Sequence, residues 1–165
     1  MNLITTLNTV MLWAHLFSAV LFVGGSFFMW LVVVPASRTI TENEAERTEI
    51  VGKIARRFGK ITTHILAVLI LTGIYNAFWY LPSMAALYGT YSGQLLLVKI
   101  FLVLFLLIFI YLHNVYFGKR IINLASQKDV EGLNKLRKRS RVVSALNLLL
   151  MVAILIVATM MQLPP

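Results

Sequence analysis

Four long apolar runs, separated by polar stretches, dominate the hydropathy pattern of the chain. They cover about residues 9–34, 61–80, 93–117 and 142–163. Each reaches the roughly 20 residues that a helix needs to cross about 30 Å of hydrocarbon. Because the runs are continuous and far longer than a strand, they predict helices and not alternating β-strands. We therefore expect an all-α integral membrane protein, an antiparallel four-transmembrane-helix bundle that forms one domain over residues 1–165.

Composition supports this interpretation and excludes several other classes of protein. A soluble domain of 165 residues with 59% hydrophobic and 13% charged residues could not hide its apolar surface. The hydrophobicity also excludes a disordered chain, and the absence of cysteine excludes a disulfide or zinc-thiolate scaffold. A nucleic-acid-binding protein carries its positive charge on a water-soluble domain. This chain has a net charge of +9 but no such domain, so we expect no nucleic-acid partner.

The charged residues fall into two stretches, residues 38–60 and 119–141. These stretches hold 14 of the 15 Lys and Arg residues and all 6 acidic residues. Both follow odd-numbered spans and share one side, which the positive-inside rule predicts to be cytoplasmic. This prediction places both termini outside and the multi-pass protein in the inner or plasma membrane. The basic residues would also contact anionic headgroups of the lipid bilayer.

The charged stretches are predicted to be helical extensions of the spans. The extensions cover about residues 42–60 and 119–141. Thr41 and Glu44 have the spacing of a capping box at the start of the first extension. The first apolar run is expected to end at Pro35. No positive charge precedes that run, so we interpret it as a retained helix and not as a signal peptide.

Few ionisable side chains lie within the spans, and each is costly in hydrocarbon. They are His15, His64, Lys99 and His113. The topology places His64 and His113 at similar depth near the cytoplasmic ends of the second and third spans. Two imidazoles that face each other across a helix pair can bind a haem iron from both sides. A histidine near the membrane interface can also serve only as a hydrogen-bonding residue, so both interpretations stay open.

Cationic residues near these histidines could bind haem propionates. Arg56 and Arg57 precede the second span, close to His64. Lys99 lies fourteen residues, close to four turns, before His113, so both side chains should project from a similar face. Alternatively, Lys99 could extend its ammonium group to the outer surface.

Methionine and histidine near the outer face indicate a second metal. Met11 lies one turn before His15, and Met160 and Met161 end the fourth span. Thioether and imidazole ligands suit monovalent copper and need no cysteine. These methionines could also simply fill space between helices. No phosphate-binding loop, nucleophile elbow, HExxH motif or carboxylate pair occurs in the spans, so an enzymatic activity would depend on His and Lys.

Several segments resemble the CopD (copper-resistance D) membrane-domain family. The first is HLFSAVLFVGGSFFMWLVVVPA, in the first span. The others are RRF, LTGIYNA and then ALYGTYSGQLLLVKIFLVLF. The third and fourth spans are also similar to HemJ-type protoporphyrinogen oxidases. The shared features are a lysine that opens the third helix, a histidine near its end and an asparagine, Asn147, in the final helix.

The two resemblances imply different chemistry. CopD-like proteins are associated with copper handling, whereas HemJ-like proteins bind haem b and oxidise protoporphyrinogen. His15, Lys99 and His113 match polar positions of the superfamily, but His64 does not match either pattern clearly. The final helix reads SALNLLLMV and lacks the Asn-Glu pair of HemJ enzymes, which weakens the oxidase assignment and leaves haem binding open.

Our main hypothesis from the sequence is a haem b-binding, cytochrome b-like membrane protein with a redox role. It would transfer electrons between a quinone or porphyrin substrate and a redox partner, or act as a HemJ-like oxidoreductase. The residues assigned to haem are the axial-ligand candidates His113, His64 and His15 and the propionate-binding candidates Lys99, Arg56 and Arg57.

Two alternatives stand beside it. One is a CopD-like protein of copper transport or homeostasis, with His15, Met11, Met160 and Met161 as ligands. The other is a structural subunit of a larger membrane complex, in which the histidines hold helices together by hydrogen bonds. A homodimer that packs through the glycine-containing first span is compatible with each of them.

Overall fold

The computed structural model describes residues 2–81, 83–127 and 130–162, which form helices joined by short turns and bends. Four segments are long and apolar enough to cross a membrane, which confirms the predicted all-α membrane fold. They are Leu3–Ile40, Glu46–Tyr80, Tyr91–Leu112 and Asn134–Met160. The chain divides into two compact units, the N-terminal unit (Met1–Pro82) and the C-terminal unit (Ser83–Pro165). The sidedness of the charged stretches stays a prediction.

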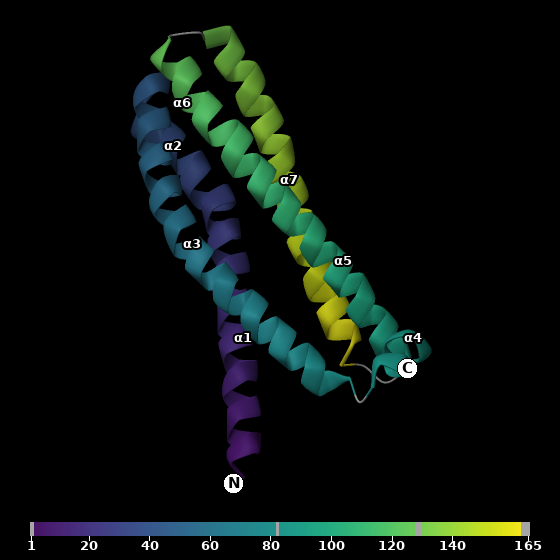
Figure 1. Cartoon of the computed structure of the whole chain (residues 1–165). Helices are drawn as coiled ribbons and strands as arrows, with labels where there is room; N and C mark the ends of the chain where they lie inside the picture. Colours follow the sequence, from purple (N-terminus) through teal and green to yellow (C-terminus); the bar gives the residue numbers. More distant parts are fainter. Residues whose placement is uncertain (1, 82, 128–129, 163–165) are drawn as a thin grey trace. The chain divides into compact units, whose positions relative to one another are not determined.

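The N-terminal unit pairs two long helical segments that run antiparallel (Figure 1). α1 (Leu3–Phe28) continues through a π-helical turn, η1 (Met29–Val33), into α2 (Val34–Ile40), and α3 (Glu44–Tyr80) packs against it. The helix therefore continues beyond Pro35, where the apolar run ends. Pro35 is the second residue of α2, a position where a helix tolerates the missing N–H of proline.

The start of α3 differs in detail from the predicted capping box. The helix begins at Glu44, and the Oδ1 atom of Asn43 just before it accepts a hydrogen bond from the Glu46 amide at 3.5 Å. The hydroxyl of Thr41 donates to Glu46 Oε2 at 2.8 Å. Thr41 thus contributes to the helix start through Glu46, while the side chain of Glu44 lies outside the described residues. As predicted, the first charged extension is helical and continues into the second span.

A row of buried and half-buried residues on α1 and at the start of η1 forms the N-terminal seam, the surface that packs against α3. The row comprises Asn8, Met11, His15, Ser18, Phe22, Gly25 and Met29. Successive members are alternately three and four residues apart, as in helices that pack side by side at a small crossing angle. At Gly25 the Phe58 ring of α3 approaches so closely that an added Cβ would lie 2.7 Å from Phe58 Cε2. The missing side chain therefore brings the two helices together.

The C-terminal unit contains the third and fourth spans. It consists of α4 (Met84–Gly89), α5 (Tyr91–Leu112), the π-helical turn η2 (His113–Gly118), α6 (Lys119–Ser126) and α7 (Val130–Met160). α5 and α7 pack against each other, and α6 also contacts α7 (Figure 1). The second charged extension is thus helical on both sides of a turn. The predicted end of the last span at residue 163 lies outside the described residues.

A second seam joins α5 and η2 to α7, and its members again alternate at spacings of three and four residues. The row on α5 and η2 comprises Ser92, Leu96, Lys99, Val103, Leu106, Ile110, His113 and Phe117, and the row on α7 comprises Ser140, Ser144, Asn147, Met151, Ile154 and Ala158. Every member of this C-terminal seam is buried or half-buried. Lys99 and His113 therefore share a face, in agreement with the four-turn spacing between them.

A tight corner joins α4 to α5. The Thr90 hydroxyl oxygen accepts a hydrogen bond from the Gly93 amide at 3.1 Å and so caps α5. Gly93 is buried, and a Cβ there would overlap the carbonyl oxygen of Ala86 and lie 2.7 Å from that of Leu87. The corner therefore depends on the absence of a side chain at this position.

We expect Gly93→Ala to destabilise the protein by about 2 kcal/mol, because overpacking against a rigid backbone costs this much. Gly89→Ala is the matched control, since nothing lies within 4 Å of its Cβ position. The free energy of unfolding, measured by titration with sodium dodecyl sulfate and circular dichroism, tests the difference. Equal stability of the two variants would contradict the proposed role of the corner.

Candidate metal-binding site

His15 is held by two polar contacts from α3. The residue lies on α1 in the N-terminal seam and is half-buried. Its Nδ1 atom is 3.1 Å from the Leu69 carbonyl oxygen and 3.1 Å from the Thr72 hydroxyl. Gly73 adds to the close fit, because a Cβ there would lie 3.0 Å from Cε1 of His15. The imidazole is thus fixed both by hydrogen bonds and by the missing side chain opposite it.

These contacts determine which ring nitrogen of His15 carries the proton. The Leu69 carbonyl can only accept a hydrogen bond, and the Thr72 hydroxyl donates to the Val68 carbonyl at 2.7 Å. Nδ1–H therefore donates, and in the neutral imidazole the lone pair lies on Nε2. Histidine ligands of metals are oriented in this way, with the other ring N–H held by a carbonyl or similar acceptor.

An open groove of about 310 Å³ lies between α1 and α3. Its lining consists of Met11, Val68, Leu71, Thr72 and Tyr75. Met11 precedes His15 by one turn on the same face of α1, so both residues lie along the N-terminal seam. The Tyr75 hydroxyl donates to Asn8 Oδ1 at 2.8 Å and joins the two helices beyond Met11. The groove thus offers soft and neutral donors and carries no formal charge.

His113 has a different environment in the C-terminal unit. Its Nε2 atom is 3.0 Å from the Ser140 hydroxyl and 3.3 Å from the Ser144 hydroxyl, both on α7. Its ring also packs against Phe117 at a centroid distance of 5.5 Å. His113 begins the π-helical turn η2, a feature that recurs at functional sites. The partners here are hydroxyl groups, which are weaker ligands for a soft metal than a thioether.

His64 is exposed on α3, where its Nδ1–H donates to the Lys60 carbonyl oxygen at 2.8 Å. Arg56 and Arg57 are exposed on the same helix, about two turns earlier. His64 belongs to the N-terminal unit and His113 to the C-terminal unit. Their pairing as axial ligands of one haem therefore stays a prediction.

The remaining candidates lie in the C-terminal unit. Lys99 is half-buried in the seam, and Met160 and Met161 lie at the end of α7 and just beyond it. A copper site that combines these methionines with His15 stays a prediction, because it would join the two units. In the described part of the chain, no three His, Cys, Asp or Glu side chains come together. A metal within one unit would therefore need methionine or neutral oxygen among its ligands.

Sequence reasoning missed the hydroxyl partners of both histidines. Thr72, the partner of His15, stands out only as a polar residue in an apolar run, whereas Ser140 and Ser144, the partners of His113, fall at the end of the second charged stretch and the start of the fourth run. Two buried amide atoms have no hydrogen-bond partner among the described residues, Nδ2 of Asn76 on α3 and Oδ1 of Asn147 in the C-terminal seam.

Comparison with known families adds an independent finding. Residues 52–161 match the family described as copper resistance protein D. The chain belongs to the CopD family. Neither a curated protein nor a solved structure matches the chain significantly. The match includes α3 from Gly52 onward and most of the C-terminal unit, and it confirms the CopD resemblance expected from the sequence.

We expect Gly73→Val to displace the His15 imidazole, because the added carbons would overlap the ring position. The ¹⁵N chemical shifts of His15 in labelled protein should then change from those of an Nδ1-protonated ring. Gly59→Val on the same helix is the control, since nothing lies within 4 Å of its Cβ position. Unchanged His15 shifts in Gly73→Val would contradict the close fit between α1 and α3.

Proposed function

We propose that the protein binds monovalent copper through Met11, which lines the groove of its N-terminal unit, and His15 one turn away, and that it acts in copper transport or homeostasis across the membrane. Membership in the CopD family supports copper as the cargo. The observation that carries the proposal is the hydrogen bonding at Nδ1 of His15, which fixes the imidazole on the face of α1 that also carries the Met11 side chain one turn away. This function is the alternative to haem that the sequence indicates, and the family match favours it.

The donor set favours the monovalent over the divalent ion. A thioether and an imidazole are ligands for Cu(I), whereas Cu(II) prefers nitrogen and oxygen ligands in tetragonal geometry. A bare cation is costly in hydrocarbon, and neutral donors in the groove lower that cost without the further cost of burying a carboxylate. The groove is lined almost wholly by apolar side chains, which suits a weakly hydrated ion better than a strongly hydrated one.

Each residue at the proposed copper site has a distinct role in this proposal. Met11 and His15 bind the ion directly. Thr72 and the Leu69 carbonyl hold the proton on Nδ1 of His15 and so keep Nε2 in its ligand form. Tyr75 and Asn8 join α1 to α3 on the far side of Met11, so that the two donors stay at the contact between the helices.

Haem b is the competing hypothesis. It assigns His113, His64 and His15 to the iron, and it would give the protein a role in electron transfer or porphyrinogen oxidation. Among the described residues, His113 contacts two serine hydroxyls and the Phe117 ring, and His64 is exposed on α3. A reduced-minus-oxidised absorption spectrum of protein expressed with ample haem tests the hypothesis. A b-type α-band would support haem and oppose the copper proposal.

We expect the purified protein to bind Cu(I) in competition with a chromophoric chelator, and His15→Ala to abolish this binding. Met11→Leu should weaken it, because leucine keeps the volume and removes the thioether. Thr72→Val should weaken it roughly tenfold, as is typical when the group that orients a histidine ligand is removed. Copper accumulation in cells that express each variant should change in the same order.

Two controls sharpen this experiment. His64→Ala removes an exposed histidine outside the groove and should leave Cu(I) affinity unchanged. The double substitution Met160→Leu/Met161→Leu tests whether the second unit contributes ligands. Undiminished copper binding by His15→Ala would overturn the proposed site.

A further inference from the structure

α7 carries a second row of residues, which we name the α7 outer face. The row comprises Lys135, Lys138, Arg139, Val142, Leu146, Leu149 and Ile156, and all of them are exposed. Neighbouring members are one, three, four or seven residues apart, and all of them project from one side of the helix. Ser140, Ser144 and Met151 of the C-terminal seam lie on the opposite side of the helix. The outer face therefore points away from the seam that packs against α5.

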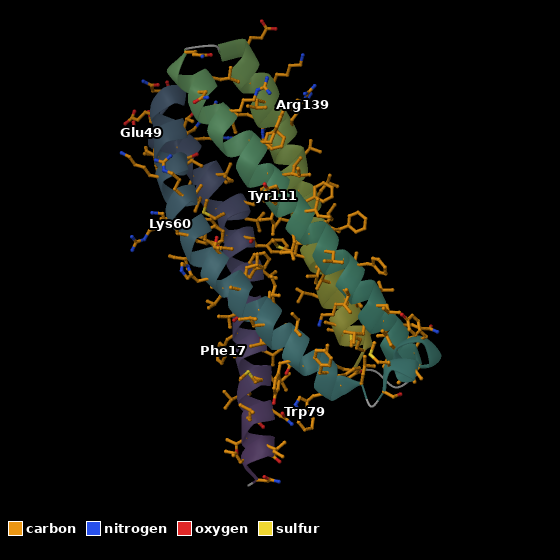
Figure 2. All side chains as sticks on the ribbon, viewed as in Figure 1. Phe17, Glu49, Lys60, Trp79, Tyr111 and Arg139 are labelled. Carbon is orange, nitrogen blue, oxygen red and sulfur yellow. The ribbon has the colours of Figure 1, made fainter. Side chains whose placement is uncertain are left out.

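The α7 outer face changes from cationic to apolar within one turn. Lys135, Lys138 and Arg139 form its first part, and Figure 2 shows the Arg139 side chain projecting away from the helix. From Val142 onward the face is apolar, with Leu149 65% exposed. Glu131, the one acidic residue of α7, lies a turn before the cationic part and away from the apolar part.

We propose that the α7 outer face is a binding site for an anionic phospholipid. The lipid phosphate binds Lys135, Lys138 and Arg139, and an acyl chain lies along Val142 and Leu146. The rise from Arg139 to Val142 is about 5 Å at 1.5 Å per residue, so headgroup and acyl-chain contacts follow one another along the helix as they do along the lipid. This proposal does not depend on copper binding.

The cationic part and the apolar part of the α7 outer face together identify the ligand. A free phosphate ion would use only the cationic part and leave the apolar part unexplained. A zwitterionic lipid would fill the apolar part but gain little from three adjacent cations, because its headgroup has no net charge. Each Lys or Arg at a membrane surface strengthens attraction to anionic lipid roughly fivefold. An anionic phospholipid is the ligand that satisfies the charge and the apolar surface together.

Tryptophan quenching by brominated lipids tests the site, because all native tryptophans lie in the N-terminal unit. They are Trp13, Trp30 and Trp79. Replacing these three by phenylalanine and introducing Leu146→Trp places the only reporter on the α7 outer face. We expect acyl-brominated phosphatidylglycerol in nanodiscs to bind at the reporter at least about fivefold more strongly than the same mole fraction of acyl-brominated phosphatidylcholine.

In the reporter background, Lys135→Gln/Lys138→Gln/Arg139→Gln should abolish this preference. The matched control Arg56→Gln/Arg57→Gln/Lys60→Gln removes the same charge from exposed positions of α3 and should preserve it. A third variant, Lys135→Arg/Lys138→Arg/Arg139→Lys, keeps the charge and should also preserve it. Equal quenching by the two lipids, or equal loss in both glutamine variants, would overturn the proposal. So would full displacement of the brominated lipid by inorganic phosphate, since the ligand would then be the free anion.

Discussion

Inside a bilayer, a polar side chain has only protein groups as hydrogen-bond partners, and this constraint governs where the polar residues of both units lie. In the N-terminal unit, Asn8 and His15 contact hydroxyl and carbonyl groups of α3. In the C-terminal unit, His113 contacts two serines of α7. The seams that pack the helices are thus also the places where the polar groups of the spans can be satisfied. The surfaces through which the helices pack therefore also hold the polar side chains that could bind a ligand.

The position of His15 in the N-terminal seam makes it both a packing residue and a candidate ligand. The contacts that α3 makes to Nδ1 of His15 stabilise the helix pair, and the same contacts determine the tautomer. His113 instead contacts its two serine partners through its Nε2 atom. Two histidines with equal roles in packing thus differ in the chemistry they offer. The difference comes from which ring atom the neighbouring helix engages.

The sequence predicts the number of spans, their approximate ends and the helical extensions, because these follow from length and hydropathy. It does not predict which face of each span turns inward, since spans that are apolar all round carry no amphipathic signal. The partners of His15 are more than fifty residues away in the chain, so their identity depends on the register of α1 against α3. The π-helical turns at Met29 and His113 were missed for a related reason, because they reflect local packing and not composition.

The residues of the proposed copper site come from two parts of the chain, and only one of these parts matches the CopD family. Thr72 and Tyr75 lie on α3, within the part of the chain that matches the CopD family, whereas Met11 and His15 lie on α1, before that part begins. Family membership therefore supports copper as a cargo, but it does not by itself assign the two ligands. Their assignment depends on the geometry of the N-terminal seam, where α3 holds His15 through residues that belong to the matched part. A copper site at this place would join donors of α1 to orienting groups of α3, and neither helix alone would provide it.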